Sequence, residues 1–191
     1  MSDHYQIVAF IDLQLDEARA VATKIIEDLR KRKILGGLIP GADDANATRR
    51  MLFKTGDAAA SVITGDPIPR QSRRAAYGVE IVIGWWAHGD GDVTHSAMCP
   101  ACGHVTEELT FDDGPLRHAA SKIADEQGGT VVGCASCGEE TLLLHWRFSP
   151  PLYFAPLAMR FGNWGPLSID LVRLLETLSG SRARVAHELV A

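Results

Sequence analysis

The amino-acid sequence predicts an α+β fold in which two helices cover one face of a mostly antiparallel sheet, the split βαβ or ferredoxin-like arrangement. Two observations lead to this class. Segments with strand alternation and segments with a helical apolar face follow one another as strand, helix, strand, strands, helix and strand. An insert that carries all four cysteines separates the second strand from those that follow. With 191 residues, the chain is long enough for one domain and a small added module.

The first strand and the first helix are expected near the N-terminus. A β-rich apolar run at 6–13 predicts a strand buried on both faces. Asp16 and Glu17 then begin a helix, where their charges favour the helix dipole. Its apolar positions have the spacing of one buried face, and they are Ala18, Val21, Ala22, Ile25, Ile26 and Leu29. We expect Gly36 and Gly37 to end this helix.

The middle of the chain contains one clear strand. Segment 38–78, in which Gly, Pro and Asp recur, is interpreted as loops with a short helix over 45–53. Residues 79–86 alternate as a strand. Adjacent tryptophans on a strand point to opposite faces, so Trp86 is predicted to lie off the main core. There it packs under a loop or the insert, and the alternative is that it belongs to a ligand or partner surface.

The later elements divide the chain into a domain and an insert. Within the insert, a strand is expected over 105–111 and a helix over 115–126. The elements expected after it are a strand at 142–148 with one strongly apolar face, a strand at 157–161, a helix at 168–179 and a closing strand at 183–189. We therefore expect residues 1–96 and 141–191 to form one α+β domain, with residues 97–140 inserted into it.

The cysteines form two Cys-x-x-Cys-Gly pairs, Cys99 with Cys102 and Cys134 with Cys137. This spacing lets both sulfurs of a pair reach one metal ion, and the following glycine frees the backbone to turn beneath them. The stretch 99–103 resembles a zinc-ribbon knuckle, and the second pair is similar. The resemblance implies one structural zinc held by four thiolates, a closed site without a position for substrate. An iron site for electron transfer and a redox dithiol are the alternatives.

The charge distribution disfavours nucleic-acid binding. The chain has a net charge of −5. Residues 97–140 contain eight acidic and two basic residues, a net charge of −6, whereas the remainder of the chain is close to neutral. Nucleic-acid affinity depends on Lys and Arg that neutralise phosphates, so this insert is poorly suited to it. No apolar run reaches the ~20 residues of a membrane span, and a basic signal region is absent, so we expect a cytoplasmic protein.

A second candidate site is the segment from His88 to His95, which also contains Asp90 and Asp92. Two imidazoles and two carboxylates are potential ligands of a catalytic metal, so a metal-dependent hydrolase is the alternative function. Against it, Gly-Asp-Gly-Asp is ordinary turn chemistry. The sequence has no nucleophile motif. The favoured interpretation is a zinc-stabilised protein that acts by binding another protein, with Trp86 and this segment as the candidate surface.

Overall fold

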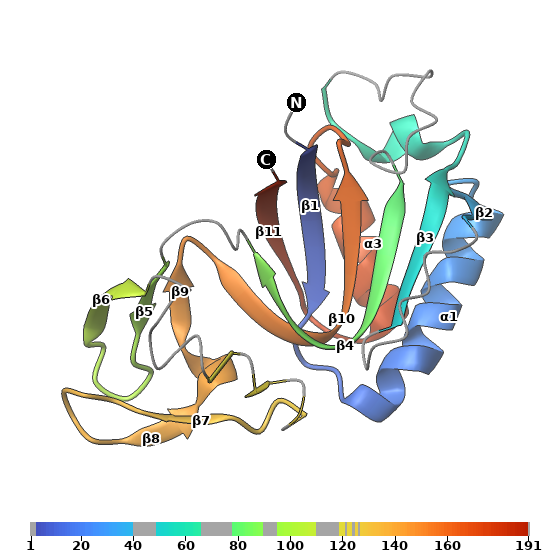
Figure 1. The fold of residues 1–191 in the computed structure, drawn as a ribbon. Coiled ribbons are helices and arrows are strands. Elements are labelled where there is room, and N and C mark those ends of the chain that lie inside the picture. Colours follow the sequence, from blue (N-terminus) through green and yellow to red (C-terminus); the bar gives the residue numbers. More distant parts are fainter. Residues whose placement is uncertain are drawn as a thin grey trace.

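The computed structural model describes residues 3–39, 49–65, 78–89, 95–109, 119–120, 122–123, 125 and 127–190. In this part of the chain, two helices pack on a six-stranded antiparallel sheet, which lies beside two smaller sheets (Figure 1). The α+β class that the sequence predicts is therefore confirmed. None of the described helices is long and apolar enough to cross a membrane.

The large sheet contains six of the strands. These are β1 (Asp3–Phe10), β2 (Leu35–Leu38), β3 (Arg49–Thr55), β4 (Val79–Gly89), β10 (Leu152–Gly162) and β11 (Ala183–Val190). The helices are α1 (Leu15–Lys31) and α3 (Ile169–Ser179), with a short 3-10 helix η1 (Ala59–Val62) between β3 and β4. One small sheet has β5 (His95–Met98) between β6 (Val105–Leu109) and β9 (Arg147–Ser149). The other pairs β7 (Val131–Gly133) with β8 (Glu140–Leu142), and the 3-10 helix η3 (Leu143–His145) follows β8.

The strand order of the large sheet is β11-β1-β10-β4-β3-β2, and each neighbouring pair is antiparallel. Helix α1 leads from β1 to β2 at one edge, and β3 and β4 then return toward the centre. Strand β10 lies between β4 and β1, and α3 leads from it to β11 at the other edge. This route does not show the ferredoxin-like topology expected from the element order. Strands β2 and β3, which come between α1 and β4 in the chain, are additions to the predicted order of elements and extend the sheet beyond β4.

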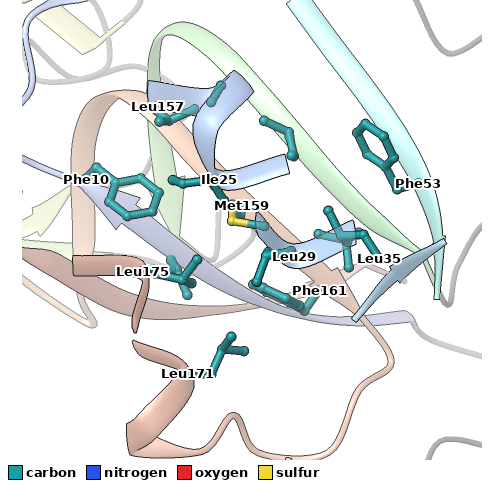
Figure 2. Packing of buried hydrophobic residues seen from close by; sticks show 14 of the residues in the cluster. Phe10, Ile25, Leu29, Leu35, Phe53, Leu157, Met159, Phe161, Leu171 and Leu175 are labelled. Atoms are coloured by element: carbon teal, nitrogen blue, oxygen red, sulfur yellow. The ribbon is translucent and has the colours of Figure 1, made fainter. Parts of the chain in front are cut away.

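One face of this sheet and both helices enclose the main core. Figure 2 shows Ile25 and Leu29 of α1 and Leu175 of α3 among Leu157, Met159 and Phe161 of β10, and all of these residues are almost fully buried. On α1, the buried positions Ala18, Ala22, Ile25 and Leu29 form the apolar face predicted from the sequence. Replacing a buried leucine of this kind with alanine costs about 2–5 kcal/mol of stability. The fold of the sheet therefore depends on this core.

The two longest strands extend past the main core. Strands β4 and β10 run side by side from the large sheet toward the smaller sheets (Figure 1). Their register shifts because β4 has one extra residue between the pairs Leu157–Ile83 and Ala155–Trp86, and Gly84 in this stretch has a φ of 128°. An extra residue bends a strand and increases its twist. The bend turns these two strands away from the plane of the large sheet.

Two predicted elements differ from the structure, and a third lies mostly outside the described residues. The helix expected over 45–53 is wrong in its described part, because β3 begins at Arg49 and places Met51 and Phe53 on the core face. The strand expected over 142–148 is divided into β8, η3 and β9. A 3-10 turn aligns side chains three residues apart, so Leu143 and Trp146 are both buried there. Most of the helix expected over 115–126 lies outside the described residues.

The end of α1 also differs from the prediction. The helix ends at Lys31, and Lys33 adopts a φ of 59° just after it. The amides of Lys33 and Ile34 donate to the carbonyls of Arg30 and Leu29, which completes the last turn. Gly36 and Gly37, expected to stop the helix, lie in β2 instead.

Candidate metal centre

The two cysteine pairs adopt the same local backbone structure. In the first, the Cys99 amide donates to the His104 carbonyl at 2.9 Å and the Gly103 amide donates to the Cys99 carbonyl at 3.0 Å. In the second, the Cys134 amide donates to the Glu139 carbonyl at 2.9 Å and the Gly138 amide to the Cys134 carbonyl at 2.8 Å. Each turn therefore places the two sulfurs of its pair on the same side of the backbone, facing the other pair.

The glycine that follows each pair has a left-handed backbone conformation. Gly103 has a φ of 74° and Gly138 has a φ of 73°. A Cβ at either position would meet no atom within 4 Å. The requirement for glycine is thus conformational and not steric, because other residues are strained at such φ values. The sequence pattern Cys-x-x-Cys-Gly predicts the same role, because the glycine allows the backbone to turn beneath the two sulfurs.

The four sulfur atoms form one compact cluster. The Sγ atoms of Cys99, Cys102, Cys134 and Cys137 all lie within 4.8 Å of one another. The Sγ atoms of Cys102 and Cys134 are 3.8 Å apart. Four sulfurs around an ion with bonds of ~2.3 Å in tetrahedral geometry are separated by about 3.8 Å. The donor set and its spacing therefore suit one metal ion.

The cluster lies at the surface of a second hydrophobic core. Cys99 and Cys134 are buried, whereas Cys102 and Cys137 are exposed. The buried residues of this second core are Trp85, Ala97, Cys99, Ala119, Ile123, Cys134, Leu143, Trp146, Leu152 and Phe154. The indole N–H of Trp146 donates to the Thr141 hydroxyl at 2.9 Å, which satisfies the polar atom of this buried ring. Each knuckle thus anchors its first cysteine in the core and presents its second to solvent.

The second core joins the cysteine cluster to the large sheet. Trp85 is contributed by β4, and Leu152 and Phe154 are contributed by β10. Gly128, with a φ of 86°, lies directly on the indole of Trp85, where an added Cβ would be 2.6 Å from a ring carbon. Residues on both sides of segment 97–140 therefore form the environment of the cluster.

The protonation of the cluster reflects the proximity of its sulfurs. Backbone hydrogen bonds from Cys137 and Ser136 lower the pKa of Cys134 to about 6. The Glu139 backbone amide lowers the pKa of Cys137, but the neighbouring sulfurs, Cys102 first among them, outweigh it and raise that pKa to about 12. Four adjacent thiols cannot all ionise near neutral pH without a cation to balance their charge. A metal ion bound here therefore displaces protons.

The described residues of the second candidate segment, His88 and His95, do not join this cluster. His88 is buried on β4, and His95 lies in β5 with its Nδ1 atom 2.7 Å from the Pro150 carbonyl oxygen. Asp90 and Asp92 lie outside the described residues. Within the described part of the chain, the four cysteines are the sole group of three or more potential ligands whose donor atoms lie close together.

Trp86 lies on the face of the large sheet opposite the helices. It pairs with Ala155, which belongs to a small buried cluster on that face with Ile7 and Ala158. The Trp86 side chain is 45% exposed, and the Arg50 guanidinium carbon lies 5.5 Å from its ring centroid. His88 pairs with Tyr153 on the same face, and its Nε2 atom has no hydrogen-bond partner. The pKa of His88 is lowered to about 3, and burial is the main cause.

A charged cluster on this face could not be predicted from the sequence. The Arg160 guanidinium binds the carboxylates of Glu80 and Glu188 and lies over the Tyr5 ring. Arg50 adds a longer contact of 3.5 Å to Glu80. These residues come from separate strands, and only the strand order places them side by side. A search of the sequence would have to know that order to find the cluster.

Comparison of the chain with protein-family models, with curated proteins and with solved structures finds no match. The function is therefore inferred from the geometry of the site.

Proposed function

We propose that the four cysteines hold one structural zinc ion, and that the protein acts by binding another protein. The observation that supports the zinc site is the sulfur cluster itself, with all four Sγ atoms within 4.8 Å and two of them in the second core. Soft thiolates select zinc or iron among common ions, and the knuckles resemble those of zinc ribbons. When bound, the ion supplies folding free energy and no open coordination position for a reaction.

In this proposal, residues 97–140 are a zinc-ribbon insert in the domain formed by residues 1–96 and 141–191. The cysteines provide the ligands, and Gly103 and Gly138 provide the turns. Trp85 and Phe154 connect the insert to β4 and β10 through the second core. The metal therefore holds the insert in place, and any partner would contact the surfaces that this arrangement exposes.

The zinc site is tested by replacing the two exposed ligands. We expect Cys102→Ser and Cys137→Ser to bind much less than one zinc per chain and to melt at a lower temperature, because site formation contributes folding free energy. Zinc is measured by elemental analysis after dialysis, and melting by circular dichroism. His104→Ala is the control, because His104 is exposed beside the first knuckle and offers only its backbone carbonyl to the turn.

Two outcomes contradict the zinc site. Full zinc retention in both cysteine variants would show that the cluster is not the ligand set. Stoichiometric iron with visible absorption in the wild-type protein would replace the structural zinc by an electron-transfer site.

The binding function is supported by the exposed tryptophan. Large aromatic residues are enriched at the centres of protein interfaces, and Trp86 remains half-exposed beside Arg50 on the helix-free face. We expect Trp86→Ala to lose a partner that the wild-type protein captures from its native extract, while zinc content stays the same. Ile169→Ala is the matched control, because Ile169 is an exposed apolar residue on α3. Equal capture by all three proteins would exclude Trp86 from the interface.

A further inference from the structure

The first and last strands of the large sheet bring two histidines together. His4 lies on β1 and His187 on β11, and the register pairs His187 with Gln6, two residues beyond His4. Diagonal neighbours of this kind lie on the same face of the sheet. The Nδ1 atom of His187 is 3.3 Å from the Nε2 atom of His4, and the two rings stack with centroids 5.4 Å apart.

Both imidazoles are available to a ligand from solvent. The His187 side chain is exposed and the His4 side chain is partly exposed. Partial burial, and then the electrostatic effect of the neighbouring His187, lower the pKa of His4. Its ring is therefore neutral at physiological pH, and neutral imidazole is the form that binds metal ions.

The separation of the two nitrogens fits coordination of one ion. Imidazole nitrogens bind zinc and similar ions at ~2.0–2.1 Å, and two such bonds at a tetrahedral angle separate the nitrogens by about 3.3 Å. The observed distance of 3.3 Å is therefore compatible with a shared ion as well as with a simple hydrogen bond.

We propose that His4 and His187 form a second metal site, which takes a divalent transition-metal ion suited to imidazole ligands. Imidazole nitrogens suit nickel, copper and zinc, whereas the thiolates of the cysteine cluster are softer ligands that favour softer metal ions. The two sites therefore differ in the ions that they select. Two protein ligands leave the other positions to water or to a further ligand. An ion at this site would link β1 to β11, which are the first and the last strand of the sheet in the chain.

The test uses the full chain with its cysteine cluster already loaded with zinc, and the probe is Ni²⁺. Binding is measured by calorimetry and by equilibrium dialysis with elemental analysis. We expect the wild-type protein to bind one Ni²⁺ in addition to its zinc. His4→Gln and His187→Gln should each weaken Ni²⁺ binding by at least about tenfold, since even residues that merely support metal ligands contribute that much. Glutamine can keep a hydrogen bond between the two strands but does not replace imidazole as a metal ligand. These variants therefore distinguish a shared metal ion from a simple hydrogen bond between the two histidines.

Controls distinguish this site from other modes of binding. His145→Gln should bind Ni²⁺ like the wild type, because His145 is exposed on η3, far along the chain from either strand. Ni²⁺ should raise the melting temperature of the wild type and not that of the double variant H4Q/H187Q, because a ligand of the native state stabilises it. If the double variant binds Ni²⁺ as tightly as the wild type, or if the wild type binds none, the two histidines form a hydrogen bond only and the proposal is wrong.

Discussion

At the scale of single residues, two glycines with similar backbone angles have different roles. Gly103 and Gly128 both have a positive φ, of 74° and 86°. An added Cβ at Gly103 would project into open space, whereas at Gly128 it would meet the Trp85 indole at 2.6 Å. The first glycine is needed for its conformation alone. The second is needed for its conformation and for close contact with the second core.

The two glycines predict different losses of stability on replacement with alanine. We expect Gly103→Ala to cost about 1 kcal/mol, the strain of a non-glycine residue at positive φ. Gly128→Ala adds a clash with a buried ring, and overpacking costs a further 1–3 kcal/mol, roughly. Urea unfolding of the zinc-loaded proteins measures both. A Gly128→Ala variant no less stable than Gly103→Ala would mean that Trp85 moves freely.

His88 predicts how stability depends on pH. Burial lowers its pKa to about 3 in the folded protein, while the unfolded chain keeps the usual value of 6.5. Between these two values the unfolded chain binds more protons than the folded protein, so stability falls as the pH decreases from 6.5 toward 3. His88→Leu removes the titrating group and should reduce this slope in urea unfolding measured at several pH values. His145→Gln, at an exposed position, should keep the wild-type slope; an unchanged slope in His88→Leu would contradict the assignment.

At the scale of elements, strands β4 and β10 define the architecture of the molecule. Residues 79–83 of β4 and 157–161 of β10 lie in the large sheet beside the main core. The remaining part of each strand reaches the second core, to which β4 contributes Trp85 and β10 contributes Leu152 and Phe154. The extra residue in β4 allows one continuous strand to serve both, because it bends the strand between the two cores. The simple alternation of 79–86 predicted the strand and the outward direction of Trp86, but it gave no sign of the bend.

The segment 142–148 illustrates how the tertiary environment changes an element. Its alternation of apolar and polar residues is a strong strand signal. The structure instead places a 3-10 turn at Leu143–His145, because this turn buries both Leu143 and Trp146 beside the cysteine cluster. Burial in the second core outweighs the local preference for a continuous strand.

At the scale of the whole molecule, the two cores differ in the residues that build them. The main core contains residues of both helices and of the large sheet and includes no cysteine, whereas the second core contains Cys99 and Cys134. Small cores usually need a metal or a disulfide to persist. With the proposed ion in the cysteine cluster, the second core should depend on that ion far more than the main core does.

This difference predicts a local effect of metal removal. When a strong chelator removes the ion, we expect amide hydrogen exchange to accelerate in β5, β7, β8 and β9. Protection should remain in α1, in β1 and in the part of β10 that lies in the large sheet, because their core has no metal ligand. The measurement is exchange followed by mass spectrometry. Uniform loss of protection over the whole chain would show that the two cores unfold together.

Several local features of this protein can be predicted from its sequence. The α+β class, the apolar face of α1, the start and end of α3 and the four cysteines all follow from periodicity, capping residues and spacing over a few positions. Ser168 and Gly180, for example, are the N-cap and the left-handed C-terminal residue of α3 in the structure. Interactions between neighbours in the chain produce these features, so a short window of sequence is enough to predict them.

The way in which these parts combine depends on contacts between residues that are far apart in the chain. The antiparallel pairing of β1 with β10, the cluster of Arg160 with Glu80 and Glu188, and the approach of His4 to His187 all join residues far apart in the chain. The burial of His88 and the exposure of Trp86 likewise depend on which strands lie beside β4. Strand order is selected by the packing of the whole sheet against its helices, and no local pattern in the sequence contains that information.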